Sequence, residues 1–339
     1  MKPDPVDKET QKLLDIVDRF PGTRVVVWGD FILDAYLLGT TRRISREAPV
    51  LILKYLSSEV ALGGAGNALH NLWSLGAKPV PVGLVGADES GENIVDFLKA
   101  RRIPTSGLIV RRGYQTPVKT RVMAGEENTR KQQILRIDRE SEAPRTAEFQ
   151  KSLRTRLLQA LSHAEALLVS DYSYNTVQPE VFQSARAALR RSMVPVTLDS
   201  RFHLLDFPGV TIATPNEPEV EAALKTEIGG RKNLLLRTGR ALLNRLGSPA
   251  LLITRGSRGM ALFERGSKPR LFPVQGSTDI VDVTGAGDTV ISVLTLALAC
   301  GATFSEAATL ANHAGGLVVM KRGAAVVTPD ELKKSVTES

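Results

Sequence analysis

Short apolar runs, many of them rich in β-branched residues, alternate with segments of helical periodicity along most of this chain. Most runs are bounded by glycine, proline or charged residues, which is typical of buried strands. The expected strands are 24–28, 80–85, 166–170, 194–198, 211–213 and 250–254, and the expected helices include 64–75, 90–101, 147–163 and 179–191. This alternation predicts an α/β fold with a doubly wound, mostly parallel sheet and helices on both faces.

Two stretches, at about 41–59 and 117–138, interrupt the alternation. Val118, Thr120 and Val122 show the two-residue period of a strand, and no helix intervenes. Strands inserted in pairs cannot extend a parallel sheet through short crossovers, so these stretches predict a small antiparallel sheet that projects as a lid over the ligand-binding edge. A plain edge hairpin is the alternative.

The most informative segment is the turn at 282–288, which precedes an apolar helix expected over 289–300 and ended by Gly301. Gly285, Ala286 and Gly287 leave the unpaired N–H groups of the helix start open to a ligand, and the helix dipole favours an anion there. Asp288 would repel a phosphate but suits a base that deprotonates an attacking hydroxyl. A plainly capped helix is the alternative.

Carboxylates and small residues also follow the first expected strand. Asp30 and Asp34 come after it, at the rim where open α/β sheets bind ligands, and either can contact sugar hydroxyls or cap a helix. Gly63 and Gly64 open the next helix and allow close approach of a ligand, and Asn67 can bind hydroxyls or a phosphate oxygen.

Two further turns carry candidate nucleotide contacts. In 214–219, Asn216 and Glu219 can hold Mg²⁺ or its waters beside phosphates, or can serve as ordinary residues of a first helical turn. In the strand-to-turn segment 254–259, Thr254, Gly256 and Gly259 can border phosphate or adenine, or form a hairpin turn.

Composition narrows the classes of protein. Lys+Arg 44 against Asp+Glu 36 gives a net charge of +8, but the basic residues are scattered and aromatic residues make up only 5%, so a small anionic substrate is favoured over nucleic acid. One cysteine excludes an intrachain disulfide framework. Neither a secretion signal nor an apolar stretch of about 20 residues occurs, so no membrane partner is expected and the location is cytoplasmic.

Other enzyme classes lack their motifs. The chain has no Walker A sequence, no dinucleotide fingerprint and no nucleophile elbow, and its four histidines show no zinc spacing.

Together these motifs resemble the ribokinase-like (PfkB) carbohydrate kinases, whose signatures are the Gly-Gly region with Asn67 and the turn at 282–288. The likeness covers 21–339 as one kinase domain, with 1–20 as an N-terminal extension. Within the family, the chain is most similar to the heptose 7-phosphate kinases of ADP-heptose synthesis. The matching segments are 29–34, 43–50, 132–136, 282–292 and 311–316.

The resemblance implies an ATP-dependent transfer of the γ-phosphoryl group to a sugar-phosphate hydroxyl, with ATP and Mg²⁺ as cofactors and K⁺ as a candidate monovalent cation. The implied roles are Asp288 as base; Gly285, Ala286 and Gly287 as anion hole; Asp30, Asp34, Gly63, Gly64 and Asn67 as sugar contacts; Asn216 and Glu219 for Mg²⁺ and phosphates; Thr254, Gly256, Gly259 and Asn312 for ATP; and Asp282 and Thr284 for the monovalent cation. Lys119, Arg121 and Arg136 are additional candidates for binding the distal phosphate of the substrate.

The chain departs from the heptose kinases at two places. Tyr174-Asn175 replaces a Lys-Gly pair, and Asp199-Ser200-Arg201 replaces Asp-Pro-Lys. A kinase for another sugar, such as fructose phosphate, and an idle sugar- or nucleotide-binding regulator therefore remain alternatives. The exposed strand edges of the lid predict a homodimer that pairs through the two lids.

Overall fold

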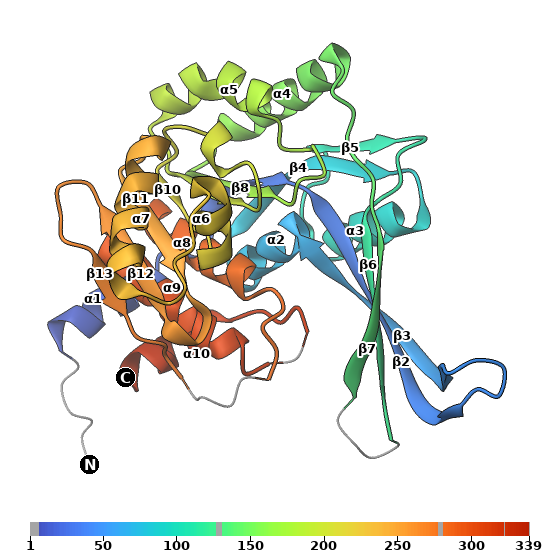
Figure 1. Ribbon diagram of the computed structural model, residues 1–339. Coiled ribbons are helices and arrows are strands. Elements are labelled where there is room, and N and C mark those ends of the chain that lie inside the picture. The colour runs from blue at the N-terminus through green and yellow to red at the C-terminus, as the bar shows by residue number, and fades with distance from the viewer. Residues whose placement is uncertain (1–6, 127–130, 277–280, 322, 339) are drawn as a thin grey trace.

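The computed structural model describes residues 7–126, 131–276, 281–321 and 323–338 and has a nine-stranded sheet with helices on both faces. A smaller four-stranded sheet projects from this body (Figure 1). The strands of the large sheet, in spatial order, are β13 (Arg270–Phe272), β12 (Met260–Glu264), β11 (Ala250–Thr254), β10 (Ile212–Ala213), β9 (Val196–Ser200), β8 (Ala166–Asp171), β1 (Arg24–Gly29), β4 (Lys78–Gly86) and β5 (Leu108–Arg111). From β11 to β5 the strands are parallel, and β12 and β13 add antiparallel edge strands.

Alternate side chains of β1 enter two separate apolar cores, one on each face of the sheet. Val25 and Val27 belong to one core, and Val26 and Trp28 belong to the other. The first core is covered by α1 (Lys8–Val17), α2 (Ala65–Ser74), α3 (Glu89–Ala100), α8 (Ala286–Ala299), α9 (Phe304–Val318) and α10 (Pro329–Thr337). The second is covered by α4 (Ala147–Leu161), α5 (Pro179–Ser192), α6 (Glu217–Leu224) and α7 (Lys232–Leu246). The doubly wound α/β fold is therefore confirmed.

The projecting sheet, here called the lid, contains β3 (Leu51–Gly64), β2 (Phe31–Ile44), β6 (Val118–Gly125) and β7 (Gln132–Arg139) in that order. The pairs β2–β3 and β6–β7 are antiparallel, but the central pair β2–β6 is parallel. The expectation of a purely antiparallel lid was wrong, because β2 and β6 both run outward from the body and so lie in the same direction. The first lid segment is also longer than the expected 41–59, since β2 starts directly after Asp30.

The expected strands and helices of the body all occur, with shifted ends. β9 begins after Pro195, which has no N–H to donate to a ladder. α8 begins at Ala286, so the small residues of the predicted turn form its first turn, and Gly301, with φ +81°, follows its C-terminus as expected. Residues 8–17 of the expected N-terminal extension form α1, which buries Ile16 and Val17 in the core.

Every helix that the structure describes is too short or too polar to traverse a bilayer.

Candidate active site

The start of α8 is built from small residues that hold its backbone open. Gly285 is the N-cap residue, with φ +77°, and a Cβ atom there would lie 2.4 Å from Asn67 Nδ2. The Ala286 N–H donates to the Val283 carbonyl oxygen at 3.2 Å. The N–H groups of Gly287 and Asp288 have no intrahelical partner at this position, and both lie at the positive end of the helix dipole. The helix start is therefore suited to hold an anion.

The Asp288 carboxylate lies in the first turn of α8 with only 4% of the residue exposed. Asn67 Nδ2 donates to its Oδ2 at 2.7 Å, and the Tyr172 hydroxyl donates to its Oδ1 at 3.0 Å. Burial raises the pKa of Asp288 to about 6, although both hydrogen bonds oppose this shift by stabilising the charged form. The group is thus ionised at neutral pH and basic enough to accept a proton from a hydroxyl.

A polar pocket of about 230 Å³ opens in front of Asp288. Its walls come from the lid, from α2, from the segments after β8 and β9, and from the start of α8. The residues that line it are Ile32, Asp34, Gly64, Asn67, Lys119, Arg121, Tyr172, Arg201, Val283, Thr284, Gly285 and Asp288. The sequence-predicted residues Asp34, Gly64, Asn67, Lys119, Arg121 and Asp288 thus converge on one cavity.

The cations of the polar pocket differ in how far they are neutralised. Arg121 donates to Asp34 Oδ1 at 2.6 Å, so this pair has little net charge. In the described part of the chain, neither Lys119 nor Arg201 forms an ion pair. Burial and the neighbouring Arg201 lower the pKa of Lys119. An anionic group entering the pocket would relieve this repulsion.

A second pocket, of about 260 Å³, lies on the other side of the α8 start and is largely apolar. Its walls come from α8, α9, β12 and the turn after β11. The lining residues are Thr254, Gly256, Ser257, Gly259, Met260, Val274, Val283, Ala286, Gly287, Val290, Asn312, Gly315, Gly316 and Val319. An apolar pocket of this size, with the few polar groups of Thr254, Ser257 and Asn312, suits an aromatic heterocycle.

The turn 285–288 separates the two pockets. Gly285 and Asp288 face the polar pocket, whereas Ala286 and Gly287 face the apolar pocket. A phosphoryl group held at the helix start would therefore lie between a ligand in one pocket and a ligand in the other. This arrangement permits direct transfer between two bound molecules.

The family of the chain follows from a sequence comparison. The pattern described as pfkB family carbohydrate kinase matches residues 22–331. The chain belongs to this family. It is an ATP-dependent carbohydrate kinase.

Curated relatives agree with this assignment. The chain is 35% identical over 329 residues to the bifunctional protein HldE of Pelobacter propionicus, with 97% of this chain and 66% of the relative covered. It is 37% identical over 325 residues to the HldE protein of Geotalea uraniireducens, with coverage of 96% and 65%. The chain thus spans about two thirds of the length of these relatives.

Solved structures share the fold. Ribokinase of Arabidopsis thaliana complexed with ribose and ATP has a TM-score of 0.71 at 20% identity, covering 94% of this chain and 99% of that one. Phosphofructokinase-2 from Escherichia coli in complex with potassium has a TM-score of 0.74 at 16% identity, with the same coverage.

The predicted phosphate and metal residues of this kinase form a helix cap. Asn216 Oδ1 accepts the N–H of Glu219 at 2.9 Å, and Glu219 Oε2 accepts the N–H of Asn216 at 2.8 Å. Burial raises the pKa of Glu219. Asp199 lies nearby, and burial together with Glu219 and Asp288 raises its pKa well above the usual value.

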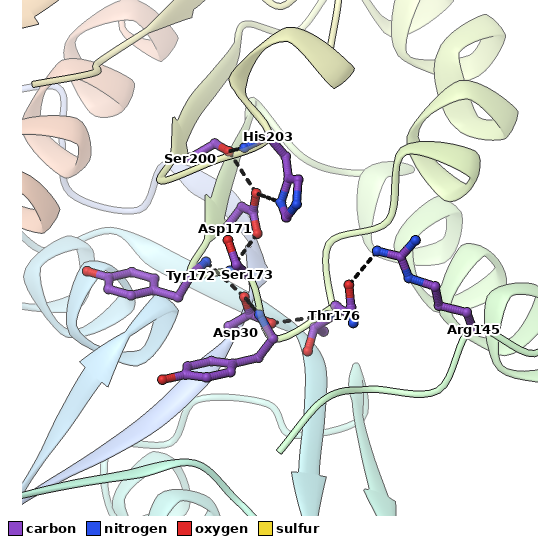
Figure 2. A network of polar contacts seen from close by, with 10 residues as sticks. Asp30, Arg145, Asp171, Tyr172, Ser173, Thr176, Ser200 and His203 are labelled. Atoms are coloured by element: carbon purple, nitrogen blue, oxygen red, sulfur yellow. Dashed lines mark hydrogen bonds and ion pairs between the residues drawn. The ribbon is translucent and has the colours of Figure 1, made fainter. Parts of the chain in front are cut away.

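The remaining predicted residues take different positions. Asp30 is buried and does not line the polar pocket, because its carboxylate accepts the N–H groups of Tyr172, Tyr174 and Thr176 at 2.8, 3.1 and 3.1 Å (Figure 2). Burial, with repulsion from Asp171, raises the pKa of Asp30 to about 6.

Gly63 contacts Asp34, since a Cβ atom there would lie 2.8 Å from Asp34 Oδ2. Arg136 lies on β7 outside the polar pocket and pairs with Asp138 at 2.9 Å. Asp282 accepts the N–H groups of Thr284 and Gly323 at 2.9 and 3.0 Å. Burial acts to raise the pKa of Asp282, but these hydrogen bonds, the one from Thr284 most of all, lower it below its usual value.

Sequence reasoning missed Tyr172 and Asp199 as site residues and considered Arg201 only as a replacement charge. All three lie at or just beyond the carboxyl ends of β8 and β9. Their place after apolar strands, at the edge that also carries Asp30, is the signal that could have found them.

The two departures from the heptose kinases have different structural effects. Tyr174 does not line the polar pocket, and its hydroxyl donates to Glu140 at 3.2 Å. Asn175 has φ +63°, a conformation that asparagine tolerates and glycine favours. Arg201 lines the polar pocket. The polar pocket therefore keeps a cation after β9, while Tyr174 supplies none.

Proposed function

We propose that this kinase transfers the γ-phosphoryl group of ATP to the anomeric hydroxyl of D-glycero-β-D-manno-heptose 7-phosphate, forming the 1,7-bisphosphate. The observation that carries this proposal is the pair of cations, Lys119 and Arg201, that line the same pocket as the Asp288 carboxylate without ion-pair partners among the described residues. A neutral sugar would form no ion pair with either side chain, whereas a sugar phosphate supplies an anion that can pair with both.

The relatives support the heptose phosphate as the first choice among sugar phosphates. These relatives carry the name HldE. In addition, the segments 29–34 and 282–292, in which the chain resembles heptose kinases, contribute Ile32, Asp34 and Asp288 to the polar pocket. Because those relatives are bifunctional and longer, only a kinase activity is proposed for this chain.

In the proposed reaction, Asp288 accepts the proton of the attacking hydroxyl as that oxygen bonds to phosphorus and the bond to the ADP oxygen breaks. The N–H groups at the start of α8 stabilise the charge on the transferring group. Asn67 donates a hydrogen bond to the base, and the lid excludes water from the polar pocket.

ATP would place its base in the apolar pocket near Asn312, with Thr254, Gly256 and Gly259 beside it. Mg²⁺ fits the chemistry of Asn216 and Glu219, since these hard oxygen donors lie close to the buried Asp199 carboxylate. A cation there would oppose the burial that raises the pKa of both carboxylates and the repulsion from Glu219 that also raises the pKa of Asp199.

No described group of three or more His, Cys, Asp or Glu side chains is arranged to hold a metal, so the ion would be held mainly through phosphates and water. Mg²⁺ supplies charge neutralisation on the phosphates when bound. Asp282 and Thr284 remain the proposed residues for a monovalent cation, K⁺ in particular.

We also propose a cytoplasmic homodimer that pairs through the lids. Apolar side chains remain exposed on the outer strands of the lid and at its tip: Ile44, Val50, Leu51, Tyr55, Leu56, Val60, Ile134, Leu135 and Ile137. A patch of this kind on unpaired edge strands favours association with a second copy.

The test is ATP consumption with a panel of phosphorylated and unphosphorylated sugars. We expect the highest kcat/KM with heptose 7-phosphate. A preference for fructose phosphate would support the alternative kinase, and binding without turnover of any acceptor would support an idle regulator. Equal rates with phosphorylated and unphosphorylated forms of one sugar would overturn the assigned role of Lys119 and Arg201.

A further inference from the structure

We propose that Tyr172 is a positioning residue for the base: its hydroxyl fixes the orientation of the Asp288 carboxylate, and its ring joins that carboxylate to the cation pair of the polar pocket. The proposal rests on the proposed function only in taking Asp288 as the base.

The two oxygens of Asp288 have different donors. Asn67 Nδ2 lies 2.7 Å from Oδ2, and the Tyr172 hydroxyl lies 3.0 Å from Oδ1. The two bonds come from opposite parts of the chain, α2 and the segment after β8, so together they fix the rotation of the carboxylate. A phenol in this position donates its proton, since burial and the adjacent carboxylate raise the pKa of Tyr172 well above its usual value.

The loop that carries Tyr172 contains two residues with a left-handed backbone. Ser173 and Asn175 have φ +67° and +63°, a conformation that asparagine tolerates but that is uncommon for serine. The buried Asp30 carboxylate accepts N–H groups from alternate residues of this loop, and Figure 2 shows it beneath the turn. Such an anchor fixes where the Tyr172 ring lies.

A second carboxylate anchors the same loop. Asp171 accepts the N–H of Ser173 at 2.8 Å and the hydroxyl of Ser200 at 2.7 Å, and its Oδ2 lies 3.2 Å from His203 Nδ1 (Figure 2). This contact ties the end of β8 to the segment after β9, which carries Arg201. The network therefore positions Tyr172 and Arg201 as one unit.

The Tyr172 ring contacts both unpaired cations. Lys119 Nζ lies 4.9 Å from the ring centroid, and Arg201 Cζ lies 4.6 Å from it. Cations at these distances are attracted to the face of the aromatic ring. An acceptor anion bound by Lys119 and Arg201 would thus contact the group that holds the base.

The effect on proton transfer has a definite sign. A hydrogen bond donated to a carboxylate favours its charged form, so the Tyr172 hydroxyl lowers the pKa of Asp288, and its removal raises that pKa. The other charged and titratable groups around Asp288 are Asp34 on β2, Lys119 on β6, Asp199 on β9, and Arg121 and Arg201 in the walls of the same pocket. All of them remain in a Tyr172→Phe variant.

The test is a carbon-13 NMR titration of the full chain labelled with [4-¹³C]aspartate, which needs no substrate. The Asp288 signal is assigned by its loss in Asp288→Asn. We expect the titration midpoint of Asp288 in Tyr172→Phe to rise by about half a pH unit or more. Tyr174→Phe is the matched control, because Tyr174 lies in the same loop but donates to Glu140 instead.

An unchanged midpoint in Tyr172→Phe, or an equal rise in both variants, would overturn the proposal. If Tyr172→Phe does not fold, Tyr172→3,5-difluorotyrosine is the alternative variant, because it keeps the ring and makes the hydroxyl a stronger donor. The titration midpoint of Asp288 should then fall below that of the wild type. An unchanged or higher midpoint would overturn the proposal. In kinetics with any acceptor that is turned over, Tyr172→Phe should lower kcat by roughly tenfold with little change in the KM for ATP. Because the titration does not depend on turnover, its failure is distinguishable from failure of the proposed acceptor.

Discussion

The two pockets on either side of the α8 start differ in chemistry and in origin. The polar pocket combines body residues with Asp34, Lys119 and Arg121 of the lid strands. The apolar pocket is formed by the body alone, from α8, α9 and the region between β11 and β12. We infer that nucleotide binding is a property of the fixed body, whereas acceptor recognition depends on how the lid meets it.

The largest effect should come from the residue at the boundary of the pockets. Asp288→Asn keeps the shape of the carboxylate but removes its basicity, so kcat should fall by roughly two or more orders of magnitude. Nucleotide affinity, measured by calorimetry, should stay nearly unchanged because the pocket proposed for ATP lies on the other side of the turn. Unchanged turnover would end the assignment of the base.

A smaller effect is expected in the polar pocket alone. Arg201→Leu removes an unneutralised cation, so the KM for the phosphorylated acceptor should rise by roughly 10- to 100-fold, as is typical when a charge-assisted contact is lost. The KM for ATP should not change. Arg240→Leu, at an exposed position of α7, is the control. Equal weakening of both substrates would contradict the separation of the pockets.

The pH dependence of kcat should report the ionisation of Asp288 in the polar pocket. Because the pKa of Asp288 is raised to about 6 and the base acts in its ionised form, kcat should be constant above that pH and fall by about tenfold per unit below it. The residual rate of Asp288→Asn should lack this acidic limb. If the variant retains the limb, another group, such as Asp30, is responsible.

The smallest effect is expected in the wall of the apolar pocket. A Cβ atom at Gly315 would lie 3.2 Å from Val290 Cγ2 and 3.5 Å from the Met260 methyl group, so Gly315→Ala narrows the slot by one methyl group. The KM for ATP should rise by about tenfold, at the low end of the effect of one methylene group in a binding pocket. The KM for the acceptor should remain at its wild-type value, and a change in it would argue against independent pockets.

Much of the fold could be predicted because its core strands are continuous apolar runs, as in Val25-Val26-Val27-Trp28. The lid was harder, since the pairing of β2 with β6 depends on where both strands leave the body and not on any local pattern. The turn before α8 could be singled out because glycine, a carboxylate and an apolar helix occur in one short segment. Its helix nevertheless begins earlier than expected, at Ala286.

The polar pocket could be predicted only in part, because it is assembled from distant segments. Asp30 was placed correctly at the sheet edge, but its hydrogen bonds go to the loop after β8, and no sequence pattern reveals this. Tyr172 and Arg201 lie within loops whose path depends on those buried carboxylates. The ring of Tyr172 therefore has no signature beyond its place after a strand.

A crystal structure of Asp288→Asn with heptose 7-phosphate and a non-hydrolysable ATP analogue tests the central claim most directly. We predict the γ-phosphate at the N–H groups of Gly287 and residue 288, the nucleotide base in the apolar pocket, the anomeric hydroxyl within hydrogen-bond distance of residue 288, and the 7-phosphate near Lys119 and Arg201. A γ-phosphate bound away from the start of α8, or an acceptor bound outside the polar pocket, would contradict the account.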